Sequence, residues 1–258
     1  MKLHMYLASS LVVALALGLG FTGPTAAAEI KVLTAGAFKQ VVLAMVPEFE
    51  RQTGHKVSVD YATAGELQKR IDSGEAFDVA VITPVAVDAL IDKGRIMQGS
   101  RVDLATVGVG VVVKEGAPKP DIGTVDAFRQ AMLAAKSVAY IDPKSGGTTG
   151  IYIEKLMDRL GIGDAVRAKA KLKMGGYVAE LVVSGEAEIG LHQISEIVPV
   201  KGAVLVGPLP KEIQNITTYA AGISAATKNQ TAAQALIKAF SGPDAASLLK
   251  SKGMEPIS

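Results

Sequence analysis

The first hundred residues alternate between short apolar runs and segments whose apolar side chains recur at helical spacing. Val42, Met45, Val46 and Phe49 fall at positions i, i+3, i+4 and i+7, which is typical of a helix with one buried face. Strands that alternate with helices of about ten residues predict βαβ units and a mostly parallel sheet. Here the predicted strands cover residues 30–34, 56–61 and 77–82, and a helix follows each of them.

Two later segments, residues 107–113 and 217–224, break this alternation. Both are long and β-rich, and neither belongs to a strand and helix pair. We interpret them as strands that cross between two lobes, which assigns residues 29–107 and 218–258 to one lobe and 108–217 to the other. The predicted fold class is α/β, with two lobes that each contain a mostly parallel sheet flanked by helices. A ligand cleft is expected between the lobes.

Residues 141–152, IDPKSGGTTGIY, turn a short apolar strand into a glycine-rich loop that leads directly into a helix. The glycines allow the backbone to approach a ligand closely, and Thr148 and Thr149 can cap the helix or present hydroxyls. The positive end of the helix then faces the loop, which favours an anion. Similar junctions end the strands before Ala37, Ala64 and Thr83. A tight turn without a ligand is the alternative for each junction.

Residues 1–28 are typical of a secretory signal peptide, because Lys2 precedes an apolar run over 11–17 and the segment ends in three alanines at 26–28. We expect cleavage after Ala28 and a periplasmic mature chain. The chain contains no cysteine, which excludes disulfides, thiolate metal sites and a cysteine nucleophile.

The formal net charge is +2, and the basic residues are interspersed with acidic ones. Nucleic acid is therefore not an expected partner. The chain also lacks tryptophan, and aromatic residues make up only 5% of it, which argues against a stacking platform for sugars or bases.

Four segments resemble the periplasmic substrate-binding proteins of ABC transporters, in the branch that includes molybdate-binding proteins. They are residues 74–81, 142–152, 185–190 and 241–246. The resemblance spans the whole mature chain and implies a type II periplasmic binding fold, with the ligand held between two lobes.

The resemblance also implies where an oxyanion would be held. In this family serine hydroxyls, backbone amides at helix starts and one tyrosine are the ligands. The two serines correspond to Ala37 and about Ala64, the loop amide to about Thr149, a further amide to Gly176 or Tyr177, and the tyrosine to Gln193. Most hydroxyl donors of the family are thus missing, and a buried dianion needs several good donors.

What this sequence offers instead is longer side chains, namely Lys39, Lys144, Tyr177, His192 and Gln193. They suggest a small organic acid as the alternative ligand, although solvated lysines and a core histidine are the simpler interpretations. The candidate ligand-binding residues are Ala37, Phe38, Lys39, Thr63, Ala64, Thr83, Lys144, Thr148, Thr149, Tyr177 and Gln193.

The predicted function is that of a periplasmic receptor that closes on a small anion, a molybdate-like oxyanion or a small organic acid, and delivers it to an ABC permease. We expect a monomer with no metal site, no cofactor and no catalytic residues. A lyase or hydrolase on the same scaffold, or a signalling sensor, is the alternative. Against an enzyme, the chain has no Gly-x-Ser-x-Gly elbow and no His-Glu-x-x-His motif.

Overall fold

A computed structural model describes residues 27–257 of the chain. The predicted signal peptide, residues 1–28, lies almost wholly outside these residues. Within the described part, no helix combines the length and the apolar composition needed to cross a lipid bilayer.

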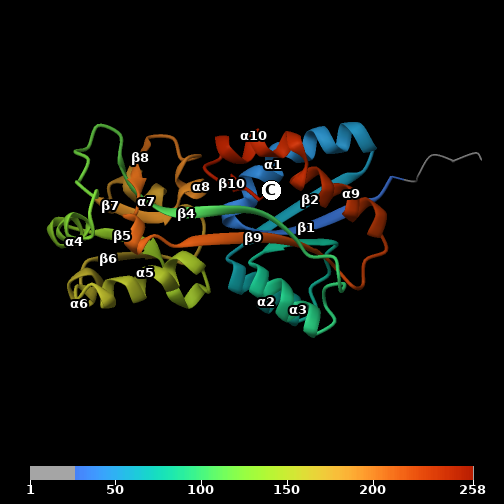
Figure 1. Ribbon diagram of the computed structural model, residues 1–258, viewed down its shortest axis with the longest axis horizontal. Coiled ribbons are helices and arrows are strands. Elements are labelled where there is room, and N and C mark those ends of the chain that lie inside the picture. The colour runs from blue at the N-terminus through green and yellow to red at the C-terminus, as the bar shows by residue number, and fades with distance from the viewer. Residues whose placement is uncertain (1–26, 258) are drawn as a thin grey trace, which may run out of the picture.

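The first lobe contains three parallel strands in the order β2-β1-β3, and β9 pairs antiparallel with β3. Helices α1, α9 and α10 pack on one face of this sheet, and α2 and α3 pack on the other (Figure 1). The bounds are β1 Glu29–Ala35, α1 Gly36–Thr53, β2 Lys56–Ala62, α2 Ala64–Asp72, β3 Val79–Ile82, α3 Pro84–Asp92, β9 Ile216–Ile223, α9 Gln230–Ser241, α10 Pro243–Ser251 and β10 Glu255–Pro256.

The second lobe contains the parallel strands β7, β5 and β6, next to the antiparallel β4 and β8. Helices α4, α5 and α6 share one core with this sheet, and α7 and α8 share another. The bounds are β4 Val102–Lys114, α4 Val125–Ala134, β5 Val138–Ile141, η1 Pro143–Ser145, α5 Thr148–Arg159, α6 Gly163–Arg167, β6 Ala170–Lys173, α7 Ala179–Ser184, β7 Ile189–Gln193, α8 Ile194–Ile197, β8 Ala203–Pro208 and η2 Lys211–Ile213.

Strand β4 runs through both lobes and changes its partners between Gly108 and Val109. Residues 102–108 pair with β9, whereas Val109 and the residues after it pair with β7 and β8. At this point the Gln214 side chain accepts a hydrogen bond from Val109 N at 2.8 Å and donates one to Val109 O at 3.0 Å. Figure 1 shows β4 and β9 side by side along the middle of the molecule, where they connect the two lobes.

Local sequence explains the main elements. All four residues of β3 (VAVI) and of β5 (VAYI) are buried, as expected for strands covered by helices on both faces. In α1 the buried positions Phe38, Val41, Val42 and Phe49 lie along one side of the helix. The helix ends where Gly54 adopts φ 75°, a conformation that glycine accepts without steric cost.

Some elements differ from the sequence prediction. The crossing strand predicted over 107–113 begins earlier, at Val102, because its first half pairs with β9. The short helix α8, which the sequence analysis does not predict, directly follows the end of β7 at Gln193. α6, α8 and β10 span five, four and two residues, which is too short for a hydrophobic period to be recognised.

Candidate functional site

A cavity of about 490 Å³ lies between the lobes and is lined by polar side chains from both of them. The strands β1, β2, β5, β6 and β7 all end at or next to this cavity, so it occupies the carboxyl edge of both sheets, the usual ligand position in open α/β sheets. It is lined by Ala35, Gly36, Ala37, Lys39, Tyr61, Ala62, Thr63, Ala64, Glu66, Ile141, Gly147, Thr148, Thr149, Lys173, Met174, Gly175, Gly176, Tyr177, Glu180, His192, Gln193, Glu196 and Tyr219.

Three helices, α1, α2 and α5, begin at the cavity wall. Their N-cap residues Ala35, Thr63 and Gly147 all line the cavity. Thr63 caps α2 by accepting a hydrogen bond from Glu66 N, whereas α1 and α5 have no side-chain cap. The first amide groups of an uncapped helix have no partner within the helix, and the helix dipole favours negative charge there. The cavity therefore presents two uncapped helix starts to an anion.

Lys39, in the first turn of α1, adds a full positive charge. Its ammonium lies 3.3 Å from the ring centroid of Tyr61 and 5.5 Å from that of Tyr177, so aromatic faces from both lobes flank it. Among residues 27–257, no carboxylate forms an ion pair with Lys39. A cation that is held by aromatic rings keeps its charge available to an anionic ligand.

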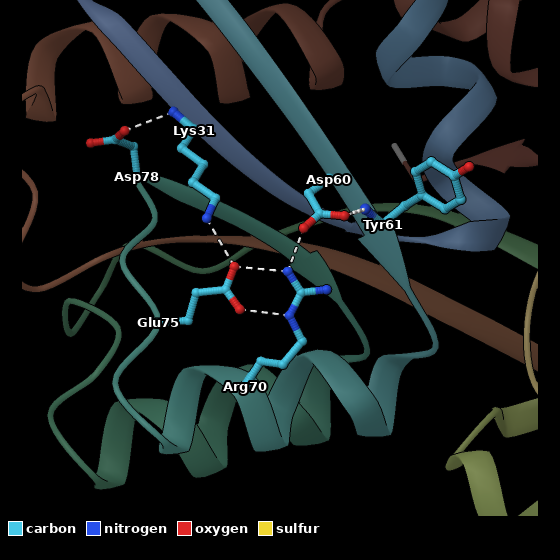
Figure 2. A network of polar contacts seen from close by, with 6 residues as sticks. All are labelled: Lys31, Asp60, Tyr61, Arg70, Glu75 and Asp78. Carbon is cyan, nitrogen blue, oxygen red and sulfur yellow. Dashed lines mark hydrogen bonds and ion pairs between the residues drawn. The ribbon is translucent and has the colours of Figure 1, made fainter.

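A network of charges behind Tyr61 fixes the end of β2 against α2 (Figure 2). Arg70 of α2 forms ion pairs with Asp60 and Glu75, and Lys31 of β1 also pairs with Glu75, at 2.8 Å. The hydrogen bonds from Arg70 and then Lys31 lower the pKa of Glu75 to about 2. In Figure 2 the ring of Tyr61 points away from this network, which leaves it free to contact Lys39.

A chain of hydrogen bonds runs along another part of the cavity wall. Tyr219 of β9 donates from its hydroxyl to Gln193 Oε1 at 2.8 Å, and Gln193 Nε2 donates to Thr148 Oγ1 at 3.2 Å. Burial is the main reason that the pKa of Tyr219 is raised, so its hydroxyl stays protonated and acts as a donor. The chain joins residues of β9, β7 and α5, and it fixes the Thr148 hydroxyl at the start of α5.

His192 and Glu196 form a buried pair in the same wall. His192 Nε2 lies 3.2 Å from Glu196 Oε2, and the side chains are 2% and 10% exposed. Burial raises the pKa of Glu196 to about 8 and lowers the pKa of His192 to about 3, so both groups are neutral at pH 7. The two neutral groups therefore face each other at this distance within the wall. His192 Nδ1 and Ser195 Oγ are buried with no hydrogen-bond partner among the described residues.

The two lobes contact each other around the cavity. Gln40 of α1 donates to the Tyr177 hydroxyl, Thr63 donates to the carbonyl oxygen of Ser145, and Gly65 N donates to Gly146 O at 3.2 Å. Gly65 and Gly146 also touch through their backbones, since a Cβ on Gly65 would lie 2.8 Å from Gly146 Cα. The arrangement is that of two lobes closed around a shared cavity.

Residues 30–255 match the family described as bacterial extracellular solute-binding protein. The chain belongs to this family. An aconitate isomerase of Pseudomonas sp is 32% identical over 234 residues and covers 88% of each chain. The molybdate-binding protein ModA of Azotobacter vinelandii is 31% identical over 255 residues, which is 95% of this chain and 96% of that one.

Solved structures agree with the fold of this solute-binding protein. The periplasmic molybdate-binding protein of Azotobacter vinelandii superposes with a TM-score of 0.74 at 20% identity, and it covers 89% of this chain and 100% of its own. The two-lobed α/β fold and the resemblance to molybdate-binding proteins, both predicted from the sequence, are confirmed.

Most of the candidate ligand-binding residues lie together in the solute-binding protein. Ala37, Lys39, Thr63, Ala64, Thr148, Thr149, Tyr177 and Gln193 all line the cavity. Their contact with a ligand stays a prediction. Gln193 and Thr63 already use their polar atoms in hydrogen bonds within the protein. Thr148 and Thr149 do not cap α5, because Gly147 is its N-cap and the two threonines are its first residues.

Three candidates do not line the cavity. Phe38 is fully buried in the first lobe, where its ring packs edge-on against Phe240 at 5.9 Å. Thr83 starts α3 and lines a separate surface groove. Lys144 is exposed in η1, where its own backbone nitrogen donates to the capping carboxylate of Asp142. Helix direction and turn geometry carry these side chains elsewhere, although their neighbours reach the cavity.

Several lining residues were missed in the sequence. Tyr61 and Tyr219 are aromatic residues in predicted strands. The position of Tyr61 near the end of its strand, and of Tyr219 on the inner face of the sheet, could have indicated that they line the cavity. Glu196 follows Gln193 by three residues, but α8 was not predicted. Among the described residues, no group of three or more histidine and acidic side chains is arranged to hold a metal ion.

Proposed function

We propose that the protein is a periplasmic receptor for a small organic acid with two or more carboxylates, and that it delivers this ligand to an ABC permease. The observation that carries the proposal is Lys39, a cation without a described carboxylate partner, which lines the same cavity as the uncapped starts of α1 and α5. Several separate sources of positive potential suit a ligand with several separate negative groups.

The cavity is less suited to a single tetrahedral oxyanion. The cavity measures about 490 Å³, compared with roughly 30 Å³ for one water molecule, so a single tetrahedral oxyanion would leave part of it unfilled. The positions that correspond to the family's serines carry the methyl groups of Ala37 and Ala64, which donate no hydrogen bonds. A dehydrated dianion in this cavity would lack several of the donors that it needs.

A ligand of this kind would contact both lobes. Lys39 and the start of α1 belong to the first lobe, and the start of α5 belongs to the second. Contacts with both lobes favour the closed form, because they give the ligand a higher affinity for it. A ligand with equal affinity for the open and closed forms would not change the equilibrium between them. Delivery to a permease follows from recognition of the closed form, and the expected genetic context is a permease and an ATPase encoded beside this gene.

Isothermal titration calorimetry of the mature chain tests the ligand class. The panel is molybdate, tungstate, sulfate, succinate, citrate and the two aconitate isomers. We expect binding in the micromolar range or tighter for at least one di- or tricarboxylate and none for molybdate. Tight binding of molybdate without any carboxylate binding would reject the proposal. Native mass spectrometry of protein purified without refolding would identify a co-purified acid directly.

A second candidate function is the isomerisation of an unsaturated carboxylic acid. The relative from Pseudomonas sp is named aconitate isomerase, and it is as similar to this chain as the molybdate-binding relative. The observation that favours this candidate is the His192 and Glu196 pair, a proton-carrying couple in the cavity wall. Nuclear magnetic resonance spectroscopy of cis- or trans-aconitate incubated with the protein tests it through the ratio of the two isomers.

A further inference from the structure

A buried glutamate needs a reason when it faces a cavity that is otherwise arranged for anions. Glu196 Oε2 contacts His192, and Oε1 lies against Gly36, the first residue of α1. A Cβ at Gly36 would lie 2.5 Å from Oε1, so a side chain there would displace the carboxyl from this position. Two elements from different lobes thus hold Glu196 in one position on the cavity wall.

We propose that Glu196 is a catalytic acid and base that moves a proton between two carbon atoms of a bound unsaturated polycarboxylate, with His192 as the residue that positions it. This inference rests on the carboxylate ligand class proposed above. It assigns the proton transfer to one named carboxyl group.

The groups that face the pair explain how Glu196 can act in this way. Lys39 of α1 and Lys173 of β6 are the charged neighbours, and Tyr219 of β9 is the titratable neutral one. Burial outweighs the effect of Lys39 and raises the pKa of Glu196 to about 8. A general base works best when its pKa lies near the working pH, and roughly one Glu196 in ten is ionised at pH 7 if its pKa is about 8.

The proton transfer needs no other reactant. The ionised Glu196 removes a proton from a CH₂ group that lies between a carboxylate and a C=C bond. The electron pair of the broken C–H bond forms a new C=C bond, and the pair of the old C=C bond moves to its far carbon. Glu196 then gives the proton to that carbon, which forms a C–H bond and restores the carboxylate. The double bond has moved by one position, and the substrate is isomerised without oxidation.

The intermediate carries an additional negative charge, which the cavity can stabilise. Lys39 and the amide groups at the starts of α1 and α5 are fixed before the reaction begins. The described polar contact of His192 is with Glu196, so we assign its imidazole the role of positioning this carboxyl.

Proton transfer is measured by incubating the mature protein with trans-aconitate or cis-aconitate in D₂O. We expect the proton spectrum to show formation of the other isomer and loss of CH₂ signal through deuterium uptake. Glu196→Gln should bind the acid within about threefold of the wild-type affinity while turnover falls by about 10² to 10⁴, the usual contribution of a general acid or base. Glu212→Gln, at an exposed glutamate of η2, is the matched control and should retain full turnover.

His192→Gln tests the positioning role. The glutamine amide can donate to Glu196 and favours its ionised form, so the pH profile of turnover should move to lower pH while the acid still binds. An unchanged profile would reject the role of His192. Wild-type protein that binds the acids without isomerisation or deuterium uptake, or a turning-over Glu196→Gln variant, would overturn the inference and leave the receptor proposal intact. Absence of binding to every acid would reject both proposals.

Discussion

At the scale of single residues, the cavity of this protein combines a neutral acid with a cation that has no carboxylate partner among residues 27–257. Lys39 is held by two tyrosine rings, and Glu196 is kept protonated by burial. Had Glu196 been ionised, it would have competed with the ligand for Lys39. Its neutrality therefore preserves the positive potential of the cavity at pH 7.

Lys39→Met should weaken binding of a polycarboxylate by about 10-fold to 100-fold. The substitution keeps the length of the side chain but removes a charged hydrogen bond, which is worth about 1.5–3 kcal/mol. Calorimetric titration with the acid that the wild type binds best measures the change. Lys144→Met, at an exposed lysine of η1, should leave the affinity unchanged. Equal affinities for all three proteins would show that Lys39 is not a ligand contact.

Stability should fall as the pH rises from 6.5 to 8, and Glu196→Gln should remove this fall. The pKa of Glu196 is raised from 4.5 to about 8, so between these values the folded state binds more protons than the unfolded state and loses stability with rising pH. The pKa of His192 is lowered from 6.5 to about 3, so its effect is opposite and ends at pH 6.5. Between pH 4.5 and 6.5 the two effects cancel.

The expected difference is about 2 kcal/mol over 1.5 pH units, at about 1.4 kcal/mol per unit. Urea unfolding of wild type and Glu196→Gln at pH 6.5, 7.2 and 8 measures it. The amide of the variant has nearly the same shape as the carboxyl, which limits structural damage. Parallel curves for the two proteins would mean that Glu196 is already ionised at pH 6.5.

The sequence could indicate single residues only where a motif placed them. Thr148, Thr149 and Ala37 follow predicted strands directly, so their position at the cavity was predictable. The position of Phe38 outside the cavity was not predictable from the motif. One step along a helix turns a side chain by about 100°, which separates Phe38 from its neighbour Lys39. The pairing of His192 with Glu196 also depends on burial and on a four-residue helix, which no local pattern reveals.

At the scale of elements, the strand-to-helix junction is the repeated unit of the site. α1, α2 and α5 each begin within a few residues of a parallel strand's carboxyl end, and the alternating pattern predicted these junctions. What the pattern could not supply is the close approach of two junctions from different lobes. Gly65 and Gly146 meet through their backbones. In the sequence, each glycine only indicates a local turn or helix start, so their contact could not be predicted.

Gly65→Ala should weaken ligand binding by about 10-fold and also destabilise the closed arrangement of the lobes. The added Cβ would lie 2.8 Å from Gly146 Cα, which opposes closure, and overpacking of this kind costs about 1–3 kcal/mol. Alanine within a helix is otherwise favourable. Calorimetry and urea unfolding measure the two effects.

Gly207→Ala provides the comparison for this substitution. Its Cβ would meet only Ile122 Cδ1, at 3.7 Å, and Gly207 lies in β8 away from the cavity. We expect wild-type affinity for this variant. If Gly65→Ala bound the ligand as tightly as Gly207→Ala, the Gly65 and Gly146 contact would not limit closure.

At the scale of the whole molecule, β4 and β9 decide how the lobes are connected. The two predicted crossing segments correspond to strands that pair with each other at the junction of the lobes (Figure 1). The order β2-β1-β3-β9-β4-β7-β5-β6 was not predictable, because pairing over long sequence separations leaves no local pattern. The lobe boundaries at residues 107 and 217 stay predictions.

Closure of the whole molecule should be weakened by Tyr177→Phe, because the Tyr177 hydroxyl accepts a hydrogen bond from Gln40 of the other lobe at 2.5 Å. The variant keeps the ring beside Lys39 and loses only this contact. A neutral hydrogen bond contributes about 0.5–1.5 kcal/mol, so the ligand should dissociate about 3-fold to 10-fold faster. Stopped-flow displacement measures the rate. In Tyr152→Phe the lost hydroxyl donates to Ile213 O within the second lobe, so the dissociation rate should not change. Most changes in affinity between related complexes arise from changes in the dissociation rate. If the variant instead bound the ligand more slowly and released it at the wild-type rate, Tyr177 would assist entry of the ligand and not closure.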